Sequence, residues 1–299
     1  MQLKQLIAII AVTLLISSCK KDAEAEVIPQ EIATDTLTAV PVASDKDPNV
    51  LQKHLAAFTK RKDAVKIEVK TLSPQQANNL YDRYVVENNK AISVMDSIEG
   101  RLLENFYTYF TDETGNRKTP PDSIARKGKL LKSAGLELWE IGEGIVEIRT
   151  QPNFYLDIFK GRVTPDYREY IEIIAEEDND LYSADAGIAI SFEAVGRRVV
   201  SWENFIAKYP NSKLIEDAKN TYNGYQADYL FGQDNTPTME DNSTKLYPEN
   251  EKEIKNFISK YPDSFTTKLA KIVLGNTTLN RDELRTLIAN EQEKYLRQK

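Results

Sequence analysis

The sequence has very few of the residues that support common enzymatic or metal chemistry. The single cysteine, Cys19, excludes a disulfide bond within the chain. The single histidine, His54, excludes a zinc site built from two histidines, and a Ser-His-Asp triad would have to use it. After Cys19 there is no Walker loop, no dinucleotide-binding glycine motif, and no Gly-x-Ser-x-Gly or Ser-x-x-Lys nucleophile. The sequence therefore predicts no cofactor and favours a non-enzymatic role.

Long apolar runs are also missing, except at the amino end. Residues 6–16 are apolar apart from Thr13, which is too short for the roughly 20 residues that span a bilayer. The run follows the charge of Lys4 and ends in Ser17 and Ser18, which predicts a signal peptide over residues 1–18. Leu15-Ile16-Ser17-Ser18-Cys19 resembles the lipobox of bacterial lipoproteins. The resemblance implies cleavage before Cys19 and diacylation of its thiol.

The residues that follow Cys19 bear on the membrane in which the protein is anchored. Two acyl chains suffice for stable anchoring, so we expect the membrane to be a partner only through the lipid. The tract 20–26, Lys-Lys-Asp-Ala-Glu-Ala-Glu, resembles the acidic sorting signal of surface lipoproteins in Bacteroidota. It can equally be the start of a solvated tether. Because Lys20 replaces the Asp of the inner-membrane retention signal, we expect the outer membrane, facing the periplasm or, preferably, the cell surface.

A tether is predicted to separate the lipid from the folded part. Residues 22–48 contain three prolines but no glycine or aromatic residue, and their charge is mostly acidic. Such a segment buries too little apolar surface to offset its ordering entropy. Removal of residues 1–18, with the one charge of Lys4, changes the formal net charge from −7 to −8. This balance argues against nucleic acid as a partner. We therefore assign 19–48 to the lipidated cysteine and a disordered acidic tether.

The region 49–161 is predicted to be helical with a small β element. Residues 64–70 alternate apolar and charged side chains, which indicates a possible strand. Ser73-Pro74-Gln75-Gln76 is typical of a capped helix start, and an apolar stripe follows it to Phe110. Residues 136–150 place apolar runs on both sides of Gly142-Glu143-Gly144, which predicts a β-hairpin. His54 lies among Leu51, Leu55 and Phe58 at helical spacing, so we interpret it as a helix-surface residue.

The region 162–299 is predicted to be helical throughout and contains an internal repeat. Helices are expected to begin at Thr164-Pro165 and to cover 188–208. Phe-Ile-Ala-Lys-Tyr-Pro-Asn-Ser at 205–212 recurs as Phe-Ile-Ser-Lys-Tyr-Pro-Asp-Ser at 257–264, each followed by an alanine. Proline cannot continue a helix, so each copy predicts a helical hairpin. The repeat residues that we single out are Phe205, Tyr209, Pro210, Ala218, Phe257, Tyr261, Pro262 and Ala270.

These residues resemble the tetratricopeptide-like repeats of bacterial envelope proteins, including the helical lipoprotein of the outer-membrane β-barrel assembly machine. The copies here begin 52 residues apart, at 205 and 257, against a usual period of 34. The Trp/Leu-Gly half of the consensus is missing, and 231–250 is an insertion. The resemblance thus implies a solenoid-like helical-hairpin geometry without the assembly function. The predicted fold class is mainly α with a small β element.

Several other residues could contribute to ligand sites. The cluster Glu176-Glu177-Asp178-Asn179-Asp180 with Asp185 could supply carboxylates to calcium or to a glycosidase, but it lacks the glycine of an EF-hand loop. Residues 232–237 predict a turn, or a binding loop if a cleft surrounds them. Trp139 and Trp202 could stack on sugars or pack internally. Two functional classes follow: a helical interaction or scaffold module for another envelope protein or a peptide, and a polysaccharide-binding or polysaccharide-degrading lipoprotein.

Overall fold

The computed structural model describes residues 49–299, all of which belong to one compact unit. It is mainly helical, as predicted, with three small two-stranded antiparallel sheets among these residues. The predicted signal peptide, lipidated Cys19 and tether lie outside the described residues.

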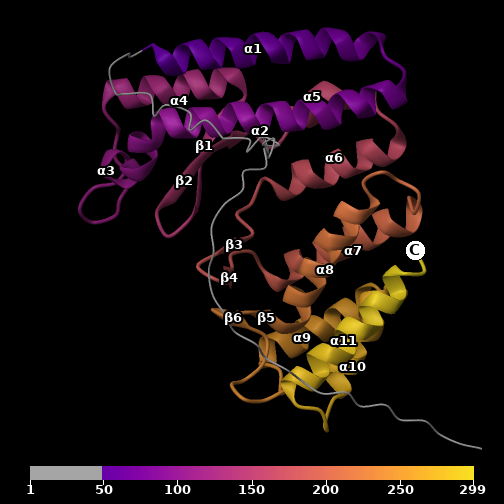
Figure 1. The fold of residues 1–299 in the computed structure, drawn as a ribbon. Helices are drawn as coiled ribbons and strands as arrows, with labels where there is room; N and C mark the ends of the chain where they lie inside the picture. Colours follow the sequence, from indigo (N-terminus) through magenta and orange to yellow (C-terminus); the bar gives the residue numbers. More distant parts are fainter. Residues whose placement is uncertain (1–48) are drawn as a thin grey trace, which may run out of the picture. The chain divides into compact units, whose positions relative to one another are not determined.

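The elements alternate between long helices and short hairpins (Figure 1). In the first half they are α1 Val50–Glu68, the 3₁₀ turn η1 Val69–Thr71, α2 Pro74–Glu104, α3 Phe106–Phe110, α4 Asp122–Ala134, β1 Leu136–Gly142, β2 Ile145–Thr150, α5 Phe154–Phe159 and α6 Pro165–Glu177. In the second half they are β3 Ser183–Ala184, β4 Gly187–Ile188, α7 Phe192–Lys208, α8 Ile215–Phe231, β5 Gly232–Gln233, β6 Thr236–Pro237, α9 Pro248–Lys260, α10 Phe265–Gly275 and α11 Arg281–Leu296.

The predicted strand at 64–70 is wrong, because this segment forms the end of α1 and the turn η1. A strand would place Val65, Ile67 and Val69 on one face. Instead Val65 and Val69 are 0% and 2% exposed, whereas Ile67 is 67% exposed. Residues four apart share a helix face and residues two apart do not. Val65 and Val69, four residues apart, fit both the two-residue repeat of a strand and one face of a helix. The alternation alone therefore could not distinguish the two structures.

Helix α2 begins where the sequence predicts. The Ser73 side chain accepts a hydrogen bond from the Gln76 amide, and the Gln76 side chain accepts one from the Ser73 amide, which completes a capping box. The helix ends earlier than the apolar stripe suggests. Asn105 leaves the helical conformation at φ −105°, and its side-chain amide donates to the Arg101 carbonyl at 2.8 Å. The five-residue helix α3 follows, and Tyr109 within it is half-buried.

The hairpin predicted at 136–150 is confirmed as β1 and β2. Glu143 and Gly144 form the two-residue turn with φ values of 51° and 80°, the combination that a type I′ hairpin turn needs. The outer side of β2 is held by α2, because the Ile148 amide donates to Asp96 at 2.9 Å. The hairpin is thereby fixed to the long helix.

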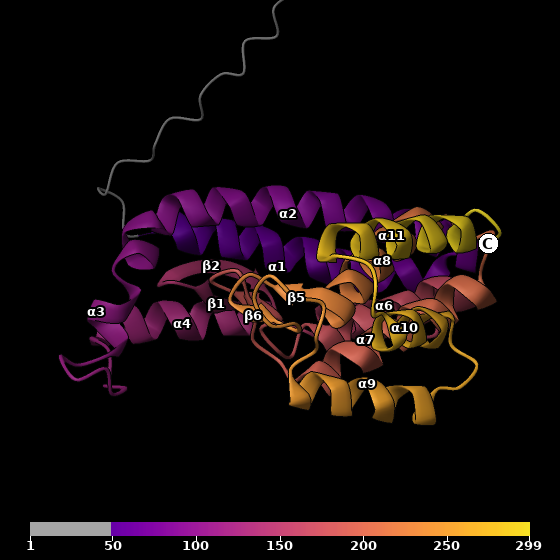
Figure 2. The same ribbon diagram turned by 90° about the horizontal axis from the view of Figure 1, so that it is seen from below.

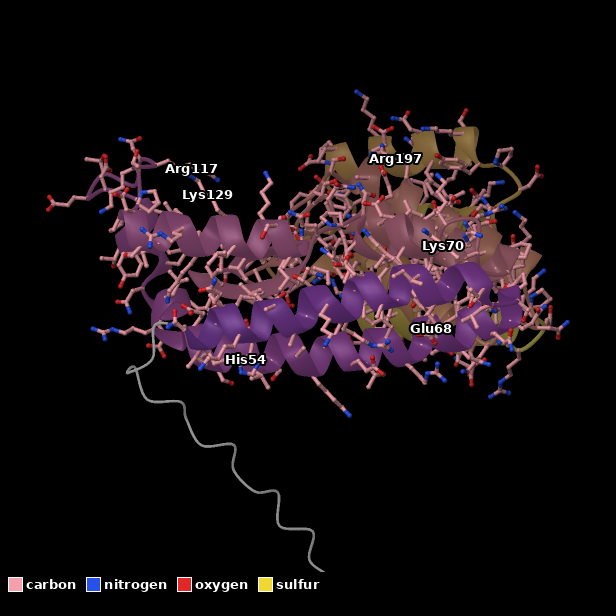
Figure 3. The ribbon with its side chains drawn as sticks, turned by 90° about the horizontal axis from the view of Figure 1, so that it is seen from above. His54, Glu68, Lys70, Arg117, Lys129 and Arg197 are labelled. Carbon is pink, nitrogen blue, oxygen red and sulfur yellow. The ribbon has the colours of Figure 1, made fainter. Side chains whose placement is uncertain are left out.

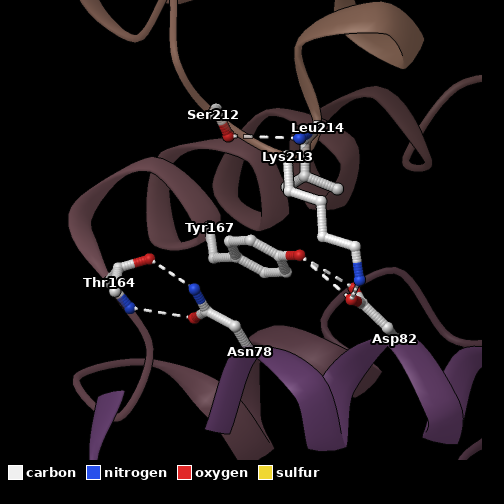
Figure 4. Close-up of polar contacts among 7 residues, drawn as sticks. All are labelled: Asn78, Asp82, Thr164, Tyr167, Ser212, Lys213 and Leu214. Carbon is white, nitrogen blue, oxygen red and sulfur yellow. Dashed lines mark hydrogen bonds and ion pairs between the residues drawn. The ribbon is translucent and has the colours of Figure 1, made fainter. Parts of the chain in front are cut away.

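Polar contacts tie α2 to α6 and to the connection between α7 and α8 (Figure 4). Asn78 on α2 exchanges two hydrogen bonds with Thr164, the residue before α6, at 2.7 and 3.1 Å. Asp82, one turn further, accepts from the Tyr167 hydroxyl at 3.1 Å and pairs with Lys213 at 2.6 Å. Because Lys213 lies in the connection between α7 and α8, a single helix turn of α2 fixes both α6 and the first repeat.

The two repeat copies have matching turn geometry. Helices α7 and α9 end at Lys208 and Lys260, and the tyrosine after each adopts φ/ψ of −128°/56° in the first copy and −127°/61° in the second. The rings of Phe205 and Tyr209 lie 5.2 Å apart, and those of Phe257 and Tyr261 lie 5.0 Å apart, both at 55°. The first helix is shorter than predicted, since Ile188 lies in β4 and Ser191 caps α7.

Both copies bury the residues that the repeat shares. Phe205 and Ala218 are 0% exposed, and Phe257 and Ala270 are 2% and 0% exposed. Pro210 and Pro262, by contrast, are exposed just beyond the helix ends. The phenylalanines and alanines therefore carry the packing of each helical hairpin, while the prolines mark its turn.

A buried carboxylate joins the two repeat copies. Glu203 of α7 is 8% exposed and accepts hydrogen bonds from the Ser264 hydroxyl at 2.9 Å and from the Phe265 amide at 2.6 Å. It also accepts from the amide and hydroxyl of Thr266 and from the Tyr222 hydroxyl. A carboxylate at a helix amino terminus is favourable because the first amides lack partners within the helix. Glu203 thus caps α10 from the neighbouring helix.

Candidate binding cleft

A cleft with a volume of 730 Å³ lies between α3, α4 and β1. Helix α4 and strand β1 diverge from Gly135, and α3 lies near the open end of this angle (Figure 1). Figure 2 shows the hairpin between α2 and α4, with β1 on the α4 side. The lining residues are Phe106, Tyr107, Phe110, Thr111, Gly115, Arg117, Lys118, Gly128, Lys132, Leu136, Glu137, Leu138, Glu140 and Gln151.

Aromatic side chains of α3 form one wall of the cleft. Phe106 and Phe110 stack with ring centroids 4.4 Å apart at 21°. Tyr107 is 39% exposed, lies against the backbone of Gly144 and donates its hydroxyl hydrogen bond to Glu140. This hydrogen bond raises the pKa of the Tyr107 hydroxyl. The ring wall is therefore held against the hairpin and still presents apolar surface to solvent.

A folded loop places two cations beside these rings. Asp112 accepts hydrogen bonds from the amides of Thr114 and Asn116, both at 2.9 Å, and from the Thr114 hydroxyl. These hydrogen bonds, that from the Thr114 side chain first, lower the pKa of the Asp112 carboxyl. The Lys118 amide then donates to the Phe110 carbonyl at 2.9 Å. The turn around Asp112 consequently returns the chain to α3 and brings Arg117 and Lys118 to the cleft.

The rim of the cleft is cationic, although the chain as a whole carries a net charge of −7. Arg117, Lys118 and Lys132 line it, and none of them forms a salt bridge within residues 49–299, although the charge of Lys118 also acts on Asp112 and helps to lower the pKa of that carboxyl. Lys129 lies one turn before Lys132 on α4 but does not line the cleft. Figure 3 shows Arg117 and Lys129 on the side of α4 that faces away from α1 and α2.

Two carboxylates line the cleft, and both already have partners. Glu137 pairs with Arg149 through Nε at 2.9 Å and Nη2 at 2.8 Å. Glu140 is exposed and accepts the hydrogen bond of Tyr107. The cleft therefore combines apolar rings with three cations and two carboxylates. Glu137 is paired with Arg149, whereas the partner of Glu140 is an uncharged hydroxyl. Cations outnumber the carboxylates that lack a cationic partner by three to one, an arrangement suited to binding an acidic ligand that also has apolar groups.

The tryptophans are not free stacking platforms. Trp202 is 0% exposed, and its indole nitrogen donates to Glu177 at 2.8 Å. Trp139 is half-buried, and the Arg149 guanidinium lies 3.3 Å above the centre of its ring. The internal-packing interpretation therefore holds for Trp202, and one face of Trp139 is occupied. His54 is exposed on α1, as predicted, and its side chain does not line the cleft.

Glu177, in the acidic cluster at the end of α6, has a structural role. Glu177 accepts from Trp202 and, at 3.0 Å, from the Tyr225 hydroxyl, while Arg198 donates to the Glu177 backbone carbonyl at 2.9 Å. Burial raises the pKa of Glu177 to about 7. Within residues 49–299, no group of three or more His, Cys, Asp or Glu side chains has the geometry to hold a metal ion. Residues 232–237 form the β5–β6 turn, as predicted.

Comparison with protein-family models, with curated proteins and with solved structures found no match. None of the helices that the structure describes is long and apolar enough to cross a membrane. The assignment of a function therefore depends on the cleft and on the sequence.

Sequence reasoning missed the aromatic wall because it placed Phe106 and Phe110 on the packing stripe of a continuous helix. Asn105 ends that helix, so Phe106 and Phe110 lie on the separate helix α3, where both are half-buried and line the cleft. The available signal was the aromatic cluster Phe-Tyr-Thr-Tyr-Phe directly before a polar, glycine-containing loop. Aromatic residues beside a loop are candidates for ligand contact as well as for packing.

Proposed function

We propose that this chain is a non-enzymatic interaction module of the bacterial envelope, held to the outer membrane by lipid on Cys19. The helical hairpins of its second half act as a scaffold. The cleft between α3, α4 and β1 binds another envelope protein. The preferred location is the cell surface.

The composition of the cleft is the observation that carries this proposal. Exposed aromatic surface bordered by unpaired cations is typical of recognition sites, in which aromatic residues and arginine supply most of the contact energy. A volume of 730 Å³ is within the range of ligand-binding clefts. Stacked helical hairpins are commonly used as rigid supports for such surfaces.

Crosslinking and pull-down from the native envelope test the interaction. We expect the wild type to recover a stable protein partner and Tyr107→Ala to lose it. Tyr107 is 39% exposed, so its truncation should leave the fold intact. Leu287→Ala is the matched control, because Leu287 is 36% exposed on α11 and does not line the cleft. Recovery of the protein alone, together with saccharide binding at the cleft, would instead favour the polysaccharide-binding alternative.

The proposed anchor has a separate test. Mass spectrometry of the amino-terminal peptide should show a diacylated Cys19 as the first residue, and Cys19→Ser should release or mislocalise the protein. The unchanged chain is the control for localisation. An unmodified peptide that begins before Cys19 would contradict the lipoprotein assignment.

A further inference from the structure

The pairing of the hairpin shows which peptide groups of β1 face away from β2. The Gln151 amide donates to the Gly135 carbonyl at 2.9 Å, so residues 135 and 151 form a hydrogen-bonded pair. In an antiparallel ladder such pairs alternate with pairs whose peptide groups point outward. The register pairs Leu138 with Ile148 and Glu140 with Val146, at outward positions. The Ile148 amide agrees with this assignment, because it points away from β1 to Asp96.

The two outer edges of the hairpin are treated differently. Helix α2 packs along β2, and its Asp96 accepts a hydrogen bond from the outward Ile148 amide. At the edge of β1, the outward amides of Leu138 and Glu140 have no hydrogen-bond partner within residues 49–299. Unpaired strand edges readily pair with another chain, and folded proteins usually cover or blunt them.

The cleft runs along this unpaired edge. Leu138 and Glu140 point to one face of β1 and Glu137 to the other, yet all three line the cleft. Because β1 lies on the α4 side of the hairpin (Figure 2) and the cleft is lined by residues of both β1 and α4, the cleft faces the edge of β1 that β2 does not pair. The stretch 136–140 is five residues long, so at about 3.3 Å per residue it could pair with roughly five residues of an added strand.

Charge and apolar surface indicate what kind of strand would fit. Arg117, Lys118 and Lys132 border the cleft and form no salt bridge in the described part of the chain, and Lys118 also acts on Asp112. Phe106 and Phe110 offer stacked rings on the wall. Side chains of an added strand alternate between two sides, so one set can meet the rings while the other meets the cations. The segment that fits is one in which acidic residues alternate with apolar residues.

We propose that the edge of β1 binds an extended acidic segment of the partner protein as an additional β-strand. This inference rests on the proposed function and specifies its binding mode. The outward peptide groups of Leu138 and Glu140 form the new ladder. The cations of the rim contact the carboxylates of the segment, and α3 contacts its apolar side chains. Main-chain pairing supplies affinity, and the alternating side chains supply specificity.

Binding of synthetic heptapeptides to the purified full chain tests the proposal. The probe alternates glutamate with phenylalanine or valine and is measured by calorimetry. N-methylation of the alternate amides that face β1 should weaken binding at least ten-fold, whereas methylation of the other set should change it less than three-fold. Replacing glutamate by lysine should weaken binding at least ten-fold at low salt, and less at high salt because salt screens exposed charges.

Variants and amide exchange test the same model from the side of the protein. Lys132→Glu should weaken binding about five-fold more than Lys129→Glu, its control on the same helix. On binding, the Leu138 and Glu140 amides should gain protection from hydrogen exchange, whereas the Trp139 amide, already in the ladder, should not change. Equal effects of the two methylated sets would overturn strand addition. Saccharide binding without amide protection would also overturn it.

The identity of the occupant is tested as well. The Leu138 and Glu140 amides could already be protected from hydrogen exchange in the free chain. If deletion of residues 22–48 removes that protection, the site binds the chain's own segment, and a partner peptide is rejected. Protection that rises with dimer formation in ultracentrifugation would assign it to a second copy, with the same consequence. A third outcome is that the cleft is needed to capture a protein, but the two sets of methylated peptides bind equally well. That outcome would support the proposed function and reject strand addition.

Discussion

Glu203→Ala should remove the connection between the two helical hairpins. The carboxylate is 8% exposed and is the acceptor for the Ser264 hydroxyl at 2.9 Å and the Phe265 amide at 2.6 Å, with three weaker contacts at 3.1–3.3 Å. A hydrogen bond to a charged group contributes roughly 1.5–3 kcal/mol. Two strong bonds therefore give about 3–6 kcal/mol, and water that reaches the vacated donors reduces this to an expected loss of about 3–5 kcal/mol.

Thermal and urea unfolding measure this loss. For a unit of this size each kcal/mol lowers the melting temperature by about 2–4 °C, so Glu203→Ala should melt roughly 6–20 °C below the wild type. Glu203→Gln keeps the shape and one acceptor and should lose about half as much free energy. Glu193→Gln is the control on the same helix, because Glu193 is exposed and pairs only with surface cations. Such pairs contribute about 0–1 kcal/mol. A Glu203→Ala variant within about 1 kcal/mol of the wild type would refute the reasoning.

Two further predictions concern burial. Phe205→Ala and Phe257→Ala should each cost roughly 3–5 kcal/mol in urea unfolding, because their rings are 0% and 2% exposed, whereas Pro210→Ala should cost much less. Unchanged stability with loss of a partner would make the repeat a recognition surface. Because burial raises the pKa of Glu177 from 4.5 to about 7, the folded state binds more protons between these values. The contribution of Glu177 to the free energy of unfolding is therefore fully present below pH 4.5 and is lost as the pH rises through 7. The loss is up to about 3 kcal/mol. Glu177→Gln should remove this dependence, and an equal wild-type-to-variant difference at pH 4.5 and pH 8 would contradict it.

Local signals predicted much of the fold. The capping box at Ser73 and the Gly142-Glu143-Gly144 turn specify backbone geometry through adjacent residues, so they can be recognised without knowledge of the tertiary structure. The repeat can be recognised in the same way, because its phenylalanine, tyrosine and proline are close in sequence and together mark the end of a helix. The segment 64–70 failed because its alternation also fits a helix face, and only the packing of Val65 and Val69 decides between the two.

The cleft and the buried carboxylates could not be predicted in the same way. The cleft combines α3, the loop after it, α4 and β1, and their proximity depends on where α2 ends and on how α4 reverses the chain. Glu203 reads in the sequence as an ordinary helix carboxylate. Its main donors lie 61 and 62 residues later, at the start of α10. This contact depends on how the two helical hairpins pack together, and no pattern of neighbouring residues indicates that packing.

Site-specific photocrosslinking in the native envelope tests the central claim most directly. A photoreactive phenylalanine analogue replaces Tyr107 at the cleft or, as the control, Leu287 on α11, two positions with similar exposures of 39% and 36%. The account predicts a covalent adduct with another protein at position 107 and none at position 287. No protein adduct at position 107, or equal adducts at both positions, would contradict the assignment of the cleft between α3, α4 and β1 as the binding site.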